Sequence, residues 1–254
     1  MNKTKTYAAS AGLAFAAALS LYTAGAGAAD MKIHSPIVER GVTEVELLGF
    51  RDFDKRPALD KNQEFKISVG HGFTDWLSLE VGGEIEKEKS EGKYEVEAYE
   101  LEALFQLTPQ GKYWMDVGLL AEYERAAESG NPSQFKLTPL LEKEFGPLTA
   151  TVNLVFIKES GTNKAPGTQF SYAARLKYHL TDTSLEPAIE MFGDPGRIGD
   201  MPSRSQQPHW IGPALYGKWK TAPGQALVWS VAALFGITDA ASDTRAVVRL
   251  EYEF

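Results

Sequence analysis

The sequence contains no cysteine, so neither a disulfide framework nor thiol chemistry is open to it. It also has no excess of basic residues: 26 Lys and Arg stand against 34 Asp and Glu, a net charge of -8. That balance argues against nucleic acids or anionic polymers as partners. Long apolar runs are missing after the first 30 residues, which excludes a bundle of membrane-spanning helices.

The first residues have the order of a secretory signal peptide. Lys3 and Lys5 precede an apolar run at Ala8–Leu21, and small residues suited to cleavage follow at 24–28. The run is short for a spanning helix of ~20 apolar residues, so a membrane anchor is the weaker alternative. We predict that residues 1–29 are a signal peptide. Losing its two lysines would leave 24 basic against 34 acidic residues, a net charge of -10.

The dominant pattern in the rest of the sequence is a period of two. Alternate residues of an extended strand face opposite sides, and in the last stretch one side is apolar and the other largely charged. The apolar side carries Ala246, Val248, Leu250, Tyr252 and Phe254, and the other carries Arg245, Val247, Arg249, Glu251 and Glu253. The mean hydropathy of -0.26 fits a barrel that exposes only alternate residues to lipid.

A strand that ends the chain on Phe254, with Tyr252 before it, resembles the closing strand of bacterial outer-membrane β-barrels. In that family the terminal aromatic strand is the signal that the assembly machinery recognises. Gly70–Gly82, G-H-G-F-T-D-W-L-S-L-E-V-G, resembles the strand, tight turn and strand of small Gram-negative barrels of unassigned or presumed transport function. The resemblance implies the Gram-negative outer membrane as location, and outer-membrane lipids and the barrel assembly machinery as partners. It implies no catalytic residue.

The period divides residues 42–254 into twelve predicted strands. They cover 43–50, 63–73, 76–86, 94–107, 113–124, 133–145, 148–159, 168–180, 184–193, 209–220, 226–237 and 244–254. Long polar connections follow the odd strands and short turns follow most even ones, as in barrels with long extracellular loops and short periplasmic turns. A soluble sandwich gives no reason for this sorting. We therefore predict an all-β protein, a transmembrane antiparallel up-and-down β-barrel of 12 strands.

Two places depart from the period. Residues 30–41 show no sustained alternation and contain Pro36, so we predict a periplasmic N-terminal tail or a short segment that enters the barrel. Pro139, inside the sixth strand, lacks a backbone donor for the ladder and predicts a bulge there.

The inward phase carries charges of opposite sign on different strands. Acidic residues gather on three consecutive strands, which an up-and-down barrel makes neighbours, and predict an acidic lumen wall of Glu80, Glu84, Glu86, Glu100, Glu102, Asp116, Glu122 and Glu124. Basic lumen residues come later: Arg175, Lys177, Lys218, Arg245 and Arg249. Either these charges line a polar conduit, or they form cross-strand salt bridges. Two such pairs suggested by position are Arg249 with Glu46 and Arg175 with Glu190.

The predicted function is a passive, porin-like channel for small solutes. A non-conducting structural barrel is the first alternative. The second is a lipid-modifying hydrolase, because twelve-stranded outer-membrane barrels include phospholipases and lipid A deacylases. Its weak candidate is His209, which borders a loop containing Ser203 and Ser205. The sequence has no metal-ligand spacing, phosphate loop or nucleotide fingerprint, so we predict no metal site, no cofactor and no enzyme activity.

Overall fold

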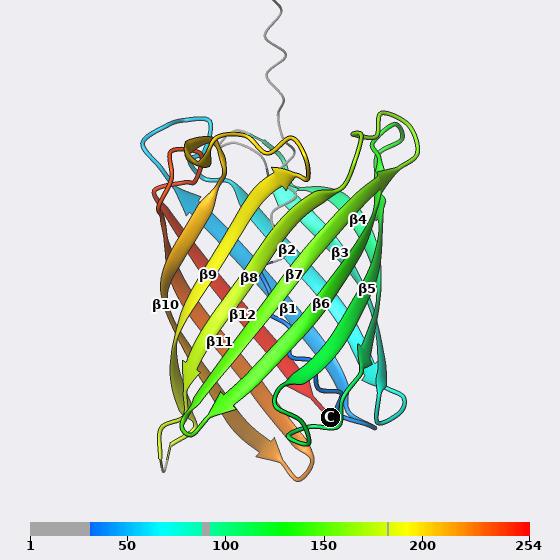
Figure 1. Ribbon diagram of the computed structural model, residues 1–254, viewed down its shortest axis with the longest axis vertical. Helices are drawn as coiled ribbons and strands as arrows, with labels where there is room; N and C mark the ends of the chain where they lie inside the picture. The colour runs from blue at the N-terminus through cyan, green and yellow to red at the C-terminus, as the bar shows by residue number, and fades with distance from the viewer. Residues whose placement is uncertain (1–30, 88–91, 182) are drawn as a thin grey trace, which may run out of the picture.

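The computed structural model describes residues 31–254 except 88–91 and 182, so the predicted signal peptide lies outside the described residues. Antiparallel strands form one closed barrel in which each strand pairs with its neighbours in sequence (Figure 1). The strands are β1 Thr43–Phe53, β2 Gln63–Gly72, β3 Leu77–Lys87, β4 Glu95–Gln106, β5 Asp116–Ala126, β6 Ser133–Phe145, β7 Leu148–Ser160, β8 Gln169–Tyr178, β9 Leu185–Arg197, β10 His209–Ala222, β11 Gln225–Gly236 and β12 Thr244–Glu253. The predicted fold class and strand count of 12 are confirmed. No helix in the described part of the chain is long and apolar enough to cross a membrane.

The ring closes where β1 pairs with β12, from Glu44 opposite Glu253 to Phe53 opposite Thr244. The last residue takes part in this seam. Thr43 N donates to the carbonyl of Phe254 at 2.8 Å, and Phe254 N donates to the carbonyl of Thr43 at 2.8 Å. A closed ring has no edge strand with unpaired backbone groups, as the interior of a bilayer requires.

The connections are sorted by end, as predicted. Loops 54–62, 127–132, 161–168, 198–208 and 237–243 lie at the end we call the long-loop end, uppermost in Figure 1. Turns 73–76, 146–147 and 223–224, residues 179–181 and 183–184, and the C-terminus lie at the opposite, short-turn end. The longer connection 107–115 is also there.

A hydrogen bond from Arg56 to Asp54 orders the first long loop and holds the pKa of the Asp54 carboxyl well below its ordinary value.

The outer face of the barrel is apolar along its middle and aromatic near both ends. Ile67, Val81 and Leu101 are 50–56% exposed, although they are large and apolar. Aromatic rings pair near the long-loop end (Phe65 with Tyr94, Tyr123 with Phe135) and near the short-turn end (Trp76 with Phe105, Tyr252 with Phe254). An apolar band between two aromatic belts is the surface of a membrane-embedded barrel.

Two local predictions are wrong. The fifth strand was predicted to start at residue 113, but β5 starts at Asp116, so Trp114 lies before the strand and is 70% exposed. Pro139 causes no bulge, because Leu137 opposite Phe156 and Leu140 opposite Asn153 keep one register on both sides of it. The proline removes a ladder donor without shifting the strands.

Part of the lumen is a packed apolar core. Leu48, Phe50, Phe192, Trp210 and Leu234 belong to this buried cluster, which lies on the side formed by β1 and β8–β12. Interior positions of small barrels are commonly filled by side chains, so this side of the lumen is wall rather than passage.

An arginine is buried in the apolar core. Arg245 donates two hydrogen bonds of 2.7 Å to the carboxylate of Asp52. Its guanidinium lies 4.0 Å from the ring centre of Phe50 and 4.3 Å from that of Trp210. A bidentate ion pair between aromatic faces compensates the desolvation of both charges. This pair therefore joins β1 to β12 near the long-loop end of the seam.

Candidate functional site

Residues 31–39 run inside the barrel, and we call them the lumen segment. Met31, Ile33, Pro36 and Val38 are all buried. The segment leads through a short turn into β1 at the short-turn end. In Figure 1 it is the dark blue coil inside the barrel. Of the two sequence interpretations of residues 30–41, a segment that enters the barrel fits residues 31–39, and a periplasmic tail does not.

Polar side chains of the wall satisfy the backbone of the lumen segment. Asn153 on β7 accepts from His34 N at 2.8 Å and donates to the carbonyl of His34 at 2.9 Å. Gln106 on β4 accepts from Val38 N at 2.8 Å. A chain without regular structure needs such partners when it leaves bulk water. The segment is therefore bound in the lumen by specific contacts.

Gly118 on β5 gives the segment its closest approach to the wall. A Cβ at Gly118 would lie 2.9 Å from both Cα and Cβ of Pro36 and 3.2 Å from the carbonyl oxygen of Phe105. Two of these neighbours are backbone atoms, which cannot move independently. The absence of a side chain at position 118 is thus a condition for the segment to pass here.

The predicted acidic wall faces inward over most of its length. Glu80, Glu100, Glu102, Glu122 and Glu124 are buried, on the adjoining strands β3, β4 and β5. Glu84 and Glu86 are half-buried nearer the long-loop end. Asp116 stands apart: it accepts a hydrogen bond from Gly111 N at 2.7 Å and orders the 107–115 connection at the other end. The acidic wall is therefore the β3–β5 set without Asp116.

Lysines from neighbouring strands bridge these carboxylates in pairs. Lys66 on β2 lies 2.5 Å from Glu100 and 2.6 Å from Glu102. Lys136 on β6 lies 2.6 Å from Glu122 and 2.7 Å from Glu124.

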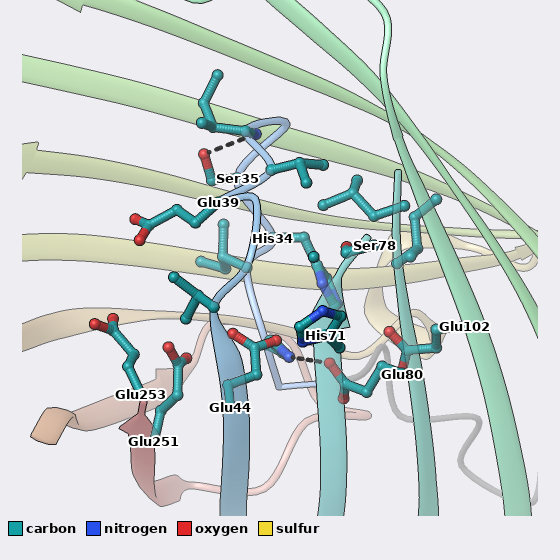
Figure 2. Close-up of a pocket in the computed structure, with 18 of the residues that line it drawn as sticks. His34, Ser35, Glu39, Glu44, His71, Ser78, Glu80, Glu102, Glu251 and Glu253 are labelled. Carbon is teal, nitrogen blue, oxygen red and sulfur yellow. Dashed lines mark hydrogen bonds and ion pairs between the residues drawn. The ribbon is translucent and has the colours of Figure 1, made fainter. Parts of the chain in front are cut away.

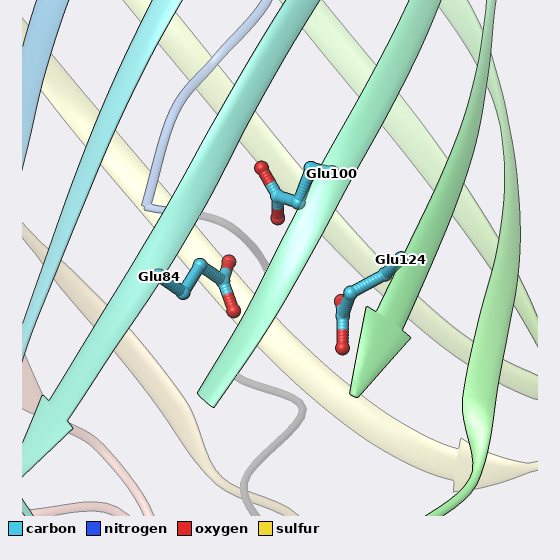
Figure 3. Close-up of side chains that lie close together, drawn as sticks. All are labelled: Glu84, Glu100 and Glu124. Carbon is cyan, nitrogen blue, oxygen red and sulfur yellow. The ribbon is translucent and has the colours of Figure 1, made fainter. Parts of the chain in front are cut away.

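Two groups of carboxylates approach each other closely. Oxygens of Glu84, Glu100 and Glu124 lie within 4.8 Å of one another, and so do those of Glu100, Glu102 and Glu122. Figure 3 shows the first group pointing toward a common point from β3, β4 and β5. Lys66 and Lys136 lie among these carboxylates, so the wall is acidic overall but its negative charge is partly neutralised.

The lumen segment adds a third such lysine. Lys32 Nζ lies 2.5 Å from Glu46 on β1 and 3.3 Å from Glu80 on β3. The Lys32 side chain is 16% exposed. Its ammonium group therefore joins the segment to the wall electrostatically, below the level of the Lys66 and Lys136 pairs.

The predicted basic residues fall into two groups. Arg245 and Arg249 are buried, whereas Arg175 is half-buried and lies 5.0 Å from the ring centre of Tyr216. Lys177 and Lys218 lie at the short-turn end, 2.7 Å from Glu186 and Glu253 respectively.

Both salt bridges proposed from position have other partners. Arg249 pairs with Glu190 at 3.0 Å instead of Glu46, and Arg175 lies 3.9 Å from Glu142 instead of Glu190. Inward side chains cross the lumen, so their partners are not set by strand order alone. Glu46 instead forms an ion pair with Lys32 of the lumen segment.

A cavity of about 260 Å³ opens beside the lumen segment at the short-turn end (Figure 2). Carboxylates form much of its lining: Glu39, Glu44, Glu80, Glu102, Glu251 and Glu253. Figure 2 shows Glu44 and Glu80 on the same wall of the cavity, and a dashed line marks the ion pair that Glu80 forms with Lys32. Apolar side chains, among them Ile33, Val42 and Leu104, line other parts.

In the described part of the chain, no hydrogen bond joins His209 to a serine side chain. Its Nδ1 lies 3.0 Å from the hydroxyl of Tyr172, and its Nε2 lies 3.1 Å from Gln207 Oε1. Ser203 and Ser205 lie 3.3 Å from each other. The nucleophile and base geometry that the hydrolase alternative needs is not formed by these residues.

The sequence patterns did not identify Lys32, Lys136 or Asp52, and they paired Glu190 with Arg175 and not with Arg249. Lys136 and Asp52 follow the inward phase of their strands, so that signal was present. Lys32 lies in a stretch without a period, so no strand phase could place it in the lumen.

No protein-family model matches the chain, and no curated protein matches it. Among solved structures, it is similar to the KdgM porin in complex with disordered oligogalacturonate, with a TM-score of 0.51 and 8% identity over 84% of this chain and 98% of that chain. It is also similar to outer membrane phospholipase A from Escherichia coli, with a TM-score of 0.39 and 12% identity over 86% of this chain and 98% of that one. The outer membrane channel DcaP of Acinetobacter baumannii gives a TM-score of 0.35 and 8% identity over 86% and 100%. At such identities the likeness is one of fold, that of outer-membrane β-barrels.

Proposed function

We propose that this protein is an outer-membrane channel for small solutes that favours cations and is closed by its own lumen segment. The observation that carries the proposal is the line of inward carboxylates, which runs from Glu84 and Glu124 near the long-loop end to Glu44 and Glu251 at the short-turn end. A barrel that served only as a membrane anchor would have no need of so many costly buried charges.

The excess of carboxylates supports a preference for cations. Charged rings in a low-dielectric wall concentrate ions of opposite sign and repel those of like sign. Lys66 and Lys136 reduce this field without cancelling it, because each lies among a larger number of carboxylates. The C-terminus lies at the short-turn end, and in outer-membrane barrels the C-terminus faces the periplasm, so we place the short-turn end on the periplasmic side.

The lumen segment supports closure as a built-in state. It takes the room beside the acidic wall, and Lys32 places a positive charge directly on the line of carboxylates. A cation that travels along this line must displace Lys32 or pass it against charge repulsion. Opening therefore means that the segment leaves its contacts with Asn153 and Gln106.

The fold likeness to the KdgM porin also supports a channel, since that protein is named a porin and 98% of its chain is covered. The likeness does not extend to its ligand. An oligogalacturonate is polyanionic, whereas the wall described here is acidic, so we propose a different class of solute for this chain.

A non-conducting structural barrel is the second candidate. It is favoured by the apolar core of Leu48, Phe192 and Leu234, which fills the other side of the lumen. The two candidates differ in whether the lumen segment can move, and that can be measured.

The test is single-channel recording with a double variant, His34→Cys/Asn153→Cys. The side chain of Asn153 reaches the backbone N and O of His34 at 2.8 and 2.9 Å, so a disulfide between cysteines at these positions would tie the lumen segment to β7. The native chain has no cysteine, so the pair is the only thiol pair present. We expect no conductance events from the oxidised protein and restored events after reduction. Each single-cysteine variant serves as the control.

Two outcomes would contradict the proposal. Equal conductance before and after reduction would mean that the segment does not control the path. If folded wild type, the reduced pair and the variant Asn153→Ala/Gln106→Ala all fail to conduct, the barrel is not a channel. The last variant removes the segment's backbone partners and should conduct most readily.

A further inference from the structure

The cavity at the short-turn end contains two carboxylates that have no ion-pair partner among the described residues. Glu44 on β1 and Glu251 on β12 both line it, from adjacent strands. In the described part of the chain neither carboxylate has an ion-pair partner, whereas Glu102 and Glu253 in the same lining are paired with Lys66 and Lys218. Lys32 and Arg175 also line the cavity, but among the described residues neither forms an ion pair with Glu44 or Glu251, so these two carboxylates attract a further cation.

A third carboxylate reaches the same cavity from a more buried position. Glu80 is 9% exposed, and its Oε1 atom is buried and has no hydrogen-bond partner among the described residues. Its other oxygen, Oε2, accepts from Lys32. A buried oxygen without a partner is costly, and a ligand donor in the cavity would relieve that cost.

Lys32 shows which kind of cation this wall accepts. Its ammonium group lies between Glu46 and Glu80, at 2.5 and 3.3 Å. The barrel therefore already holds one alkylammonium group of its own, next to the cavity. The unpaired Glu80 Oε1, with Glu44 and Glu251, forms the neighbouring position.

We propose that this cavity is a binding site for a small organic cation with a primary ammonium group, held by Glu44, Glu80 and Glu251. The proposal deepens the proposed channel function, because it names the class of solute that the acidic line would carry.

The shape of the cavity favours an organic cation over a metal ion. Its volume of about 260 Å³ greatly exceeds the ~30 Å³ of one water molecule. Ile33, Val42 and Leu104 offer apolar contacts to an alkyl chain.

Glycine at position 70 creates room for one of the ligand groups. A Cβ there would lie 2.7 Å from Glu44 Oε1, so a side chain at this position would displace the carboxylate. The inward position of Gly70 on β2 thus lets Glu44 lie flat against the wall of the cavity.

The test is calorimetric titration of the full-length folded barrel in detergent with n-butylammonium chloride. The neutral isostere 1-butanol and MgCl₂ are titrated in parallel. We expect saturable binding of one n-butylammonium per barrel and no binding of 1-butanol. The double variant Glu44→Gln/Glu251→Gln should bind at least about tenfold more weakly, since charged hydrogen bonds are the stronger ones. Glu186→Gln, at the same end but outside the cavity lining, should stay within about twofold of wild type.

A second variant tests the role of Lys32. Lys32→Met removes the internal ammonium group and frees Glu46 and Glu80, so we expect binding of n-butylammonium to rise at least about threefold or to reach two cations per barrel. Unchanged binding in the double variant, equal binding of 1-butanol, or binding of Mg²⁺ alone would each overturn the proposal. If the double variant does not fold, the two single Gln variants replace it.

The titration needs no conduction, so the two proposals can fail separately. If the barrel binds n-butylammonium but never conducts, the binding-site proposal stands and the channel proposal fails. If it conducts but does not bind n-butylammonium, only the binding-site proposal fails.

Discussion

Arg249 on the closing strand donates a hydrogen bond from Nε to the backbone carbonyl of Met31 at 2.6 Å. The same guanidinium donates to the two oxygens of Glu190 on β9 at 3.1 and 3.0 Å, and to Ser230 on β11 at 3.1 Å. One buried residue thus joins the lumen segment to three strands of the wall. The strand that closes the barrel also holds the element that fills it.

We predict that Arg249→Lys loosens the lumen segment. A lysine keeps the charge near Glu190 but cannot donate in several directions from one planar group. A hydrogen bond to a charged donor contributes about 1.5 kcal/mol or more, so the open fraction should rise roughly tenfold. Single-channel open probability measures this, with Arg125→Lys, an exposed arginine on β5, as the control. An open probability equal to that of the control would show that the Met31 contact does not hold the segment.

We predict that Asp52→Asn strongly destabilises the barrel. The change leaves Arg245 buried beside Phe50 and Trp210 without a counter-charge, and breaking a buried pair costs about 3–5 kcal/mol. Urea unfolding from lipid vesicles measures the free energy. The matched control is Asp200→Asn, which removes an exposed partner of Arg197 in a loop. A loss below about 1 kcal/mol at Asp52 would mean that the pair is not what stabilises the seam.

The terminal residue should have two separable roles. Deleting Phe254 removes both backbone hydrogen bonds to Thr43 and the aromatic ring, whereas Phe254→Ala removes only the ring. We expect the deletion to lower both assembly in cells and the stability of the refolded barrel, and Phe254→Ala to lower assembly alone. Heat-modifiable migration in gels reports both. An unchanged yield of folded barrel after deletion would place the assembly signal elsewhere.

Orientation can be tested because the chain has no native cysteine. Met201→Cys lies in the 198–208 loop at the long-loop end, and Gln110→Cys lies in the 107–115 connection at the other end. A membrane-impermeant thiol reagent added to intact cells should label position 201 and leave position 110 unlabelled until the cells are opened. The reverse labelling pattern would show that the barrel has the opposite orientation in the membrane.

The fold was predictable because every strand of a membrane barrel repeats one rule. Apolar and polar residues alternate, and loop lengths alternate between the two ends. The rule placed Glu80, Glu100 and Glu122 in the lumen, where the structure has them buried. It failed where a turn competes with the strand, as at Trp114, which precedes β5.

What crosses the lumen was not predictable in the same way. Arg249 pairs with Glu190, three strands away in the ring, because long side chains span the interior. The lumen segment has no period of its own, and its place depends on Asn153 and Gln106 as partners and on the bare backbone of Gly118. Such contacts join residues that are far apart in the sequence.

The central claim is that the inward carboxylates act on permeating ions. Its most direct test is the reversal potential of the barrel in a planar bilayer under a salt gradient, for wild type and for Glu84→Gln/Glu100→Gln/Glu102→Gln. The triple variant keeps side-chain size and removes three negative charges, two of which belong to the carboxylates paired with Lys66. Because a Debye length is about 10 Å at 0.1 M salt, the effect should be larger at low salt. We predict a cation-selective reversal potential for wild type that moves toward the anion side in the variant. An unchanged reversal potential in a conducting variant would contradict the claim and place these carboxylates off the ion path.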